Sequence, residues 1–276
     1  MIMHDMLSKG TDTLQQAGIT ECRLDAWYLL SYCMGITKSQ YYMRMNDDVD
    51  SHEVCKYEKL INRRAGRVPL QYITGSQEFM GLDFKVNEAV LIPRQDTEVL
   101  VSLALQYADG KRVLDMCTGS GCIAVSIAKL ADNASVTAVD ISKEALCLAK
   151  ENAKNNGVDI AFIESDLWEG VKEVYDIIVS NPPYITDDEM LTLMPEVLGH
   201  EPELALRGGK KGLDYYCRII SEAPDYLAAD GIIMFEIGCG QADEVSELLA
   251  AGGYTGIKVE KDLAGLDRVV WGVRPV

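Results

Sequence analysis

Val113-Leu114-Asp115-Met116-Cys117-Thr118-Gly119-Ser120-Gly121 is the stretch of this chain that decides the fold. Its first residues predict a buried strand, and the glycine-rich turn that follows leads into a helix expected over about 122–130. Glycine lets a backbone approach a ligand closely, and a helix N-terminus offers free N–H groups and partial positive charge. This order of strand, turn and helix indicates a nucleotide-type ligand bound at the edge of a sheet.

A carboxylate follows at the distance that a ribose requires. The next strand, expected over 135–139, is followed by Asp140, which stands 19 residues after Gly121. An acid at this position suits a ribose diol, and the combination fits NAD, FAD or S-adenosylmethionine. The pattern lacks the first glycine of a dinucleotide site, since Cys117 stands there, and no pyrophosphate cradle is evident. S-adenosylmethionine is therefore favoured, with the turn residues Asp115, Cys117, Thr118, Gly119, Ser120 and Gly121 as its expected contacts.

A second motif, Asn181-Pro182-Pro183-Tyr184, follows the strand expected over 175–180. Proline fixes φ and forces the preceding residue into extended geometry, so the Asn181 carboxamide points in a defined direction beside the Pro182 carbonyl. These two acceptors suit the two hydrogens of a planar –NH2 group, and Tyr184 offers a flat face for it. A rigid turn is the plain alternative, because Asn and Pro are ordinary turn residues. The glycine turn upstream favours the functional interpretation.

Helix and strand patterns alternate from residue 96 onward, which predicts a largely parallel sheet with helices on both faces. Ligands bind such sheets at the carboxyl ends of the strands, so Gly119, Asp140, Asp166 and Asn181 are expected to converge there. Strands are expected near 112–116, 135–139, 160–164, 175–180, 231–237, 254–259 and 268–273, and helices near 96–108, 121–131, 142–156, 213–229 and 240–251.

The first 65 residues show helical spacing instead and predict a small bundle. Gly66, Pro69 and Gly75 then mark a boundary, and 76–93 alternates enough for a hairpin with its turn at Gly81. We therefore expect a helical substrate-recognition domain at 1–75, a β-hairpin linker at 76–95 and a catalytic domain at 96–276. The apolar residues Leu24, Trp27, Tyr28, Cys33, Val54, Tyr57, Leu60 and Ile61 are interpreted as the core of the bundle.

Composition and charge disfavour several classes of partner, although an acidic surface is also explained by solubility alone. The 276 residues are 48% apolar, and no apolar run or leader pattern predicts a membrane segment. Eight cysteines without a Cys-x-x-Cys pair and only three histidines predict reduced thiols in a cytoplasm and no metal site. Residues 1–75 carry nine basic and nine acidic side chains, whereas 76–276 carry 17 and 34, a net charge of −17. An acidic catalytic part repels nucleic acid and attracts a basic protein.

These motifs resemble the protein-glutamine methyltransferases of the HemK/PrmC type, which modify peptide chain release factors. The resemblance extends from about residue 63 to the C-terminus. Asn-Pro-Pro-Tyr alone is shared with adenine methyltransferases, so the more specific segments carry more weight. The matching segments are Arg67–Gly75, Phe79–Phe84, Val90–Glu98, Ser165–Trp168 and Lys261–Val270.

The resemblance implies a seven-stranded Rossmann-like class I methyltransferase domain that uses S-adenosylmethionine and acts as a monomer. It implies methylation of a glutamine amide, expected in the Gly-Gly-Gln motif of release factors. It also implies that Asn181, Pro182 and Tyr184 are catalytic residues and that Pro183 is a further substrate contact. The chain departs from the family at Cys117, at Lys211 and at Trp168, which stands where Phe is common and is expected to cover the adenine. The alternatives are an adenine amino methyltransferase on DNA or RNA and a non-catalytic cofactor-binding subunit.

An amide nitrogen is a poor nucleophile, because its lone pair is delocalised into the carbonyl. We therefore expect catalysis by positioning: two acceptors on the N–H groups stabilise the charge that develops on nitrogen and turn the lone pair toward the methyl group. Asp115 either binds the methionine amino group or braces the turn, and the first role is favoured. The pattern leaves open the roles of Arg94, Glu98, Lys211 and Glu236, and whether the loop 185–212 closes over the substrate.

Overall fold

The computed structural model describes all residues from 1 to 276, and the chain divides into two compact units. The first, which we call the helical unit, comprises Met1–Gly75 together with Met194–His200. The second, the sheet unit, comprises Ser76–Leu193 and Glu201–Val276. The short segment Met194–His200 thus packs with the helical unit, although it lies within the range 96–276 expected for the catalytic domain. None of the helices is both long and apolar enough to cross a membrane.

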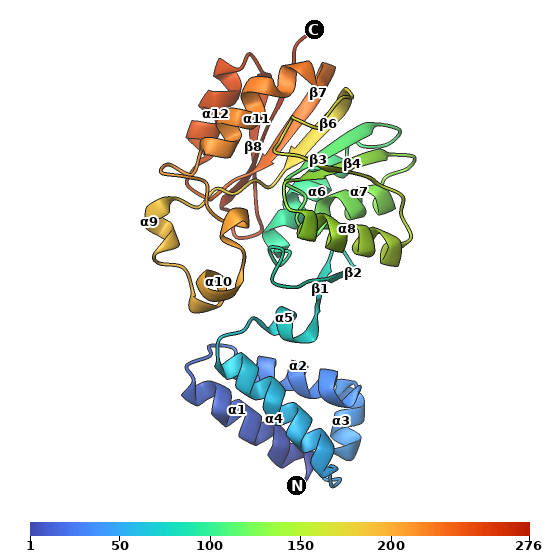
Figure 1. Cartoon of the computed structure of the whole chain (residues 1–276), viewed down its shortest axis with the longest axis vertical. Helices are drawn as coiled ribbons and strands as arrows, with labels where there is room; N and C mark the ends of the chain where they lie inside the picture. The colour runs from blue at the N-terminus through green and yellow to red at the C-terminus, as the bar shows by residue number, and fades with distance from the viewer. The chain divides into compact units, whose positions relative to one another are not determined.

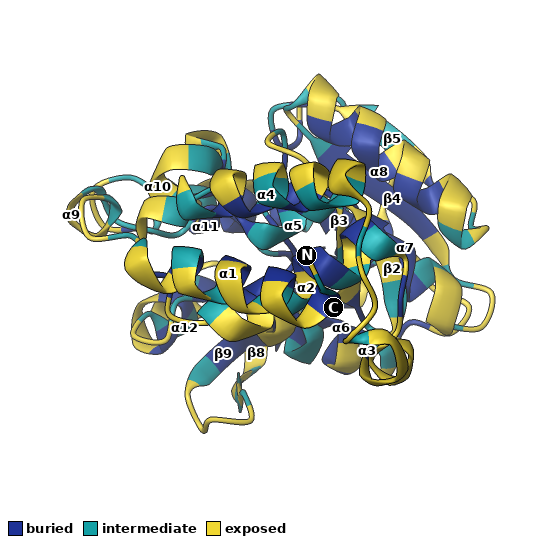
Figure 2. Ribbon diagram, turned by 90° about the horizontal axis from the view of Figure 1, so that it is seen from below, coloured by how far each residue is buried: buried dark blue, intermediate teal, exposed yellow.

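The helical unit is a bundle whose helices bury one side and expose the other (Figure 2). Glycine makes its closest packing possible: a Cβ at Gly10 would lie 2.2 Å from the Tyr57 hydroxyl oxygen, so only glycine lets α1 and α4 approach this closely. The expected core residues Tyr57 and Ile61 are buried. The helices are α1 (Met3–Gln16), α2 (Cys22–Met34), α3 (Lys38–Arg44), α4 (Ser51–Ala65), α5 (Leu70–Thr74) and α10 (Pro195–His200).

Two residues expected in the core of the bundle lie on its surface. Leu24 and Tyr28 are about half exposed, at 46% and 49%. The buried face of α2 is formed by Ala26, Leu29, Leu30 and Cys33 instead. The expectation for Leu24 and Tyr28 was therefore wrong, because α2 is apolar on more than one side and the spacing of apolar residues could not decide which side packs inward.

A buried cluster of charges joins α10 to the rest of the helical unit. Arg64 donates from Nε to Asp25 at 2.7 Å and from Nη1 to Glu196 at 3.1 Å. Arg67 also donates to Glu196, at 3.1 Å. Removing one partner from such a cluster leaves the others buried without compensation, which is more costly than losing a surface pair. The Arg64–Glu196 contact therefore fixes α10 against α4.

The sheet unit is built on a seven-stranded sheet in the order β5-β4-β3-β6-β7-β9-β8. All neighbouring pairs are parallel except those made by β9, so the expected Rossmann-like fold is confirmed. The order reverses between β3 and β6, where Asp115 pairs with Val179 and Met116 with Ser180. The strands are β3 (Arg112–Met116), β4 (Ser135–Asp140), β5 (Ala161–Glu164), β6 (Tyr175–Ser180), β7 (Leu227–Glu236), β8 (Thr255–Lys261) and β9 (Asp267–Val273).

Helices cover both faces of this sheet (Figure 1). One face packs against α6 (Glu98–Leu105), α7 (Cys122–Leu130) and α8 (Lys143–Asn156), and the other against α11 (Asp214–Glu222) and α12 (Ala242–Ala251). The helix expected over 213–229 is shorter than predicted, because the chain turns at 223–225 and enters β7 at Leu227. The remaining short helices are η1 (Gln95–Thr97), α9 (Asp187–Met190), η2 (Glu203–Ala205) and η3 (Ala223–Asp225).

The expected hairpin is present as β1 (Ser76–Phe79) and β2 (Leu82–Lys85). Phe79 and Phe84 are buried in the core beneath α6 and α7. Glu98 of α6 accepts a hydrogen bond from the backbone N–H of Met80 at 2.8 Å. The hairpin is thus part of the sheet unit, and Glu98 serves to attach it.

Candidate active site

A pocket opens where β3, β4 and β6 end, next to the point where the strand order reverses. It encloses about 1010 Å³, including the part that is open to solvent. Its lining combines the glycine turn and Asp140 with Asp166 and Asn181, so the four strand ends expected to converge do so.

The glycine turn forms the floor of this pocket. Thr118, Gly119 and Ser120 line it, and Gly121 is the N-cap of α7. Gly119 and Gly121 have φ angles of 54° and 79°, a region that favours glycine. A Cβ at Gly121 would also lie 3.0 Å from the Cβ of Ala149 on α8. The glycines therefore allow both the turn and the close packing of α7 on α8.

Asp140 is set to meet hydroxyl groups in the pocket. Its Oδ2 accepts from the N–H of Gly119 at 2.8 Å, and its Oδ1 accepts from the N–H of Ser142 at 2.9 Å. Burial raises its pKa, and the backbone N–H groups of Ser142, Gly119 and Ile141 act against that rise. The oriented carboxylate lines the pocket and fits the ribose diol of the expected cofactor.

Asp115 lies beneath the turn rather than in the pocket. It is fully buried, and its Oδ2 accepts from the Thr118 hydroxyl at 2.5 Å and from the N–H of Ala124 at 3.2 Å. Burial raises the pKa of this carboxyl to about 7. These two hydrogen bonds to Oδ2 brace the turn, whereas Oδ1 is buried without a partner, so the favoured contact with a methionine amino group stays a prediction.

Cys117 takes a conformation that L-residues rarely adopt. Its φ is 64°, and its side chain lines the pocket and packs partly against the core on the α11 face. Burial holds the pKa of its thiol well above the ordinary value. The positive φ costs about 1 kcal/mol or more relative to glycine. The thiol is therefore a neutral wall of the pocket and not a reactive group.

Asp166 and Leu167 line the pocket after β5, but Trp168 does not. The Trp168 ring is buried and stacks on Tyr226 with ring centroids 4.6 Å apart. The expectation that Trp168 covers the adenine is therefore corrected: Leu167, whose φ is 52°, presents the apolar surface there. Asp166 is paired with Arg218 at 2.8 Å. The prediction for Trp168 was wrong because a large aromatic residue next to a site often belongs to the core behind that site.

Asn181 and Pro183 of the second motif line the pocket, whereas Pro182 and Tyr184 lie outside this lining. The amide group of Asn181 donates from Nδ2 to the Thr97 hydroxyl at 3.3 Å. Tyr184 packs against the core, and its hydroxyl lies 3.5 Å from Oε1 of Glu236. The roles predicted for Pro182 and Tyr184 in gripping a substrate stay predictions.

The loop after this motif supplies a further wall. Glu201 is buried, with its Oε1 on Arg94 and its Oε2 accepting from the N–H of Ile92 at 3.3 Å. The residues that follow it, Pro202, Leu204 and Ala205, line the pocket. Arg94 thus has a role that the pattern left open: it fastens the loop over the pocket. Lys211 lies on the exposed part of the same loop.

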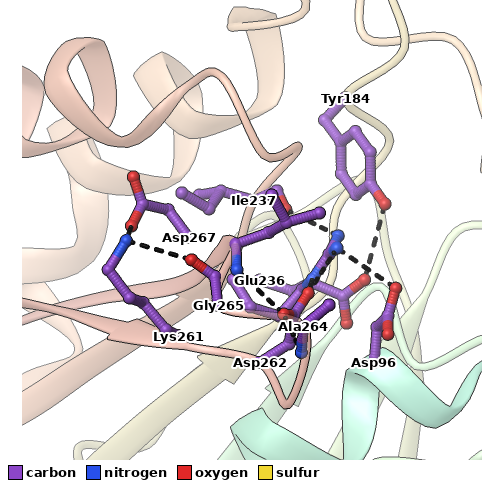
Figure 3. A network of polar contacts seen from close by, with 11 residues as sticks. Asp96, Tyr184, Glu236, Ile237, Lys261, Asp262, Ala264, Gly265 and Asp267 are labelled. Atoms are coloured by element: carbon purple, nitrogen blue, oxygen red, sulfur yellow. Dashed lines mark hydrogen bonds and ion pairs between the residues drawn. The ribbon is translucent and has the colours of Figure 1, made fainter.

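The sequence pattern left the role of Glu236 open and indicated a helix start at Thr97; the structure places Thr97 in the pocket lining and Glu236 behind it, beside Tyr184. Thr97 is buried, lines the pocket and contacts Asn181. Glu236 ends β7 and belongs to a polar network in which Arg268 pairs with Asp96 at 3.1 Å and with Asp262 at 3.0 Å (Figure 3). The sequence signal for Glu236 was a carboxylate at the end of a buried strand, since the burial of a carboxylate is energetically costly unless it has polar partners.

Comparisons with known proteins agree with this geometry. The family described as PrmC N-terminal domain matches residues 5–75, and the family described as methyltransferase small domain matches residues 95–210. A release factor glutamine methyltransferase from Geobacter sulfurreducens is 42% identical over 94% of this chain and 92% of its own length. Its counterpart from Clostridium acetobutylicum is 41% identical over 99% of both chains.

Solved structures reproduce the fold. A methyltransferase from Pyrococcus furiosus superposes with a TM-score of 0.58 at 19% identity, covering 78% of this chain and all of that one. A 16S rRNA methyltransferase from Thermus thermophilus, solved with its methyl donor and guanosine, gives a TM-score of 0.52 at 15% identity over 72% of this chain and 49% of that one. At these identities the likeness concerns the fold alone.

Proposed function

Because this chain belongs to the family of release factor glutamine methyltransferases, we propose that it transfers a methyl group from S-adenosylmethionine to the side-chain amide nitrogen of a glutamine in a peptide chain release factor. The observation that carries this proposal is Asn181, which lines the pocket at the strand ends with its Nδ2 already engaged by Thr97. The remaining end of that carboxamide is an acceptor, which is what the N–H groups of a glutamine amide require.

The residues of the pocket fit the cofactor. Asp140 offers an oriented carboxylate to the ribose, the turn at Gly119 allows close approach, and Leu167 offers an apolar surface to the base. When bound, the cofactor supplies an electrophilic methyl group on a sulfonium. The ion pair between Arg94 and Glu201 holds the loop that bears Pro202, which lines the pocket.

The protein's part in the reaction is to position the amide. Asn181 Oδ1 and the carbonyl of Pro182 would accept from the two N–H groups, stabilise the positive charge that develops on nitrogen, and turn its lone pair toward the methyl group. The stiff Pro182-Pro183 backbone favours this role, because acceptors that do not reorganise stabilise a transition state best. Tyr184 would offer its ring to the flat face of the amide.

We assign recognition of the release factor to residues 1–75, a linker role to 76–95 and methyl transfer to 96–276. A single glutamine is too small to define a protein substrate, so selectivity requires contacts far from the reacting amide. The charge of the chain supports a protein partner, because the half that carries the pocket has the whole net charge of −17. We further propose that the enzyme acts as a monomer in the cytoplasm, on the glutamine of the Gly-Gly-Gln motif.

Methylation of adenine is the second candidate, since the same two acceptors would grip an aromatic amine. The acidic sheet unit disfavours it, because binding of nucleic acid normally rests on Lys and Arg contacts with phosphates. One experiment separates these activities: incubation of the protein and labelled S-adenosylmethionine with a release factor, with the same factor lacking the glutamine, and with DNA or RNA. We expect label on the intact factor alone. Label on nucleic acid, or equal label on both factors, would contradict the proposal.

A further inference from the structure

The hairpin turn between β8 and β9, residues 262–266, exposes two leucines. Leu263 is fully exposed, and Leu266 is 48% exposed. The turn belongs to the segment Lys261–Val270, which matches the family in sequence, yet no residue of this segment lines the pocket. A single exposed leucine is ordinary on a protein surface. Two leucines in one five-residue turn form a small apolar surface that the fold does not cover.

The side chain of Asp262 holds this turn in one conformation. Its Oδ1 accepts from the backbone N–H groups of Ala264 and Leu266, both at 2.9 Å. The backbone N–H of Asp262 donates to the carbonyl of Leu266 at 2.8 Å. Gly265 has a φ of 82°, a region that favours glycine. A turn that is already ordered loses little entropy when a partner covers it, so its leucines are suited to binding.

Every charged side chain in the range 261–268 has a partner of opposite sign within that range. Lys261 pairs with Asp267 at 2.6 Å, and Arg268 pairs with Asp262 at 3.0 Å. The turn and its flanks therefore carry no net charge, although residues 76–276 together carry a net charge of −17. The tip of the turn is thus a neutral, apolar point on an acidic unit. It is complementary to an apolar surface of a protein and not to a phosphate or a basic segment.

The turn lies at the edge of the sheet where the pocket opens. Because β8 is antiparallel to β9 and β9 is antiparallel to β7, β8 runs in the direction of the parallel strands and ends at their carboxyl edge. Arg268 connects the turn to the pocket, since it pairs with Asp262 and also with Asp96, the residue before Thr97 of the pocket lining (Figure 3). The surface that receives the substrate glutamine is thus continuous with the turn.

We propose that the turn 262–266 docks the release factor, with Leu263 covered by an apolar part of that protein's surface beside its reactive glutamine. The proposal rests on the function assigned above and deepens it, because it adds a specificity contact within the sheet unit to the recognition assigned to residues 1–75. Contacts away from the reacting amide are what selectivity for a protein substrate requires. Since the turn lies outside the pocket, it contributes to binding of the release factor and not to binding of the cofactor or to methyl transfer.

The test measures the KM for the release factor, kcat, and the Kd for S-adenosylmethionine on the full-length enzyme. Leu263→Ser should raise KM about 10-fold and leave kcat and the cofactor Kd unchanged. A factor of 10 corresponds to about 1.4 kcal/mol, which is less than the full burial of a leucine side chain contributes. Leu263→Met keeps an apolar side chain of similar size and should bring KM back close to that of the wild type. An unchanged KM in Leu263→Ser, or a loss confined to kcat, would overturn the proposal.

The matched control is Leu130→Ser, which removes another exposed leucine from the sheet unit. Leu130 is 46% exposed and is the last residue of α7, a helix that begins beside the pocket and leads away from it. This change should leave KM, kcat and the cofactor Kd as they are in the wild type. An equal rise of KM in Leu130→Ser and Leu263→Ser would show a general effect of exposed apolar surface and would overturn the proposal.

A binding measurement that needs no methyl transfer separates this proposal from the proposed function. Calorimetry gives the Kd of the release factor for the enzyme with and without Leu263→Ser, and we expect that Kd to rise about 10-fold in the variant. If the factor binds in a Leu263-dependent way but takes no methyl group, the docking role is upheld and the function is rejected. If the factor is methylated and Leu263→Ser leaves its Kd unchanged, the docking role alone is rejected. A factor that neither binds nor takes a methyl group rejects both.

Discussion

Asp140→Ala is expected to weaken the binding of S-adenosylmethionine strongly. The Asp140 carboxylate lines the pocket and is oriented by the N–H groups of Gly119 and Ser142, at 2.8 and 2.9 Å. The carboxylate is therefore held in one orientation beside the pocket, where ribose hydroxyls would donate to it. Removing the carboxylate also frees the Gly119 end of the turn, so binding loses a contact and part of its preorganised floor.

The magnitude follows from the kind of hydrogen bond involved. A hydrogen bond to a charged group contributes about 1.5–3 kcal/mol, and a net loss of this size corresponds to a rise in Kd of about 10-fold to 150-fold. Asp176→Ala is the matched control, since its Oδ2 also accepts from one backbone N–H at 2.8 Å, that of Arg112. Asp176 lies near the amino end of β6, whereas the pocket lies at the carboxyl ends of the strands. Its loss should leave Kd unchanged.

Isothermal titration calorimetry on both folded variants is the assay, with thermal unfolding recorded on the same samples. An unchanged Kd in Asp140→Ala would refute the assignment of Asp140 as the ribose ligand. Equal losses of affinity in Asp140→Ala and Asp176→Ala would show that the affinity follows the stability of the sheet and not a contact in the pocket.

Four further outcomes are expected. Asn181→Ala should lower single-turnover methyl transfer by roughly 10²-fold or more and change cofactor affinity less, and a loss of only a few-fold would contradict the positioning mechanism. A protein that starts at residue 76 should still bind cofactor in calorimetry but methylate an intact release factor far more slowly; near-normal methylation, or loss of cofactor binding, would contradict the separate recognition role. Cys117→Ala should unfold in urea with about 1 kcal/mol less stability than Cys117→Gly, because φ is 64° there, and the reverse order would contradict the backbone argument. Burial raises the pKa of Asp115 and of Glu236 to about 7, so the native state binds these two protons more tightly than the unfolded chain does. The contribution of these groups to the free energy of unfolding of the cofactor-free protein should therefore be greatest below about pH 4 and be lost as the pH rises through about 7. A steady rise of the free energy of unfolding from about pH 5 to about pH 7.5, measured with urea, would contradict this.

The sheet and its ligand edge could be predicted because their signals are local. A buried strand followed at once by Gly119 and Gly121, and another followed by Asn181 and two prolines, each specify a strand end within a few residues. Parallel topology then brings those ends together without further information. The convergence of the turn, Asp140, Asp166 and Asn181 in one pocket is the result.

The rest of the site depends on contacts that no local pattern records. Thr97 meets Asn181 across 84 residues of sequence, and its position at the start of a helix is typical of an ordinary cap. Trp168 and Leu167 are neighbours in the chain. Trp168 packs into the core because it stacks on Tyr226, which is distant in sequence, and Leu167 lines the pocket instead. In the same way, the apolar residues on several sides of α2 left its buried face undetermined until the other helices were in place.

Localisation of the transferred methyl group by fragment mass spectrometry tests the central claim most directly. The release factor is treated with enzyme and cofactor, digested, and its Gly-Gly-Gln peptide is sequenced beside the same peptide from Asn181→Ala reactions. The account predicts one added methyl group on the glutamine side-chain amide, and very little in the variant over the same time. A methyl group on any other residue, or one formed equally by Asn181→Ala, would contradict it.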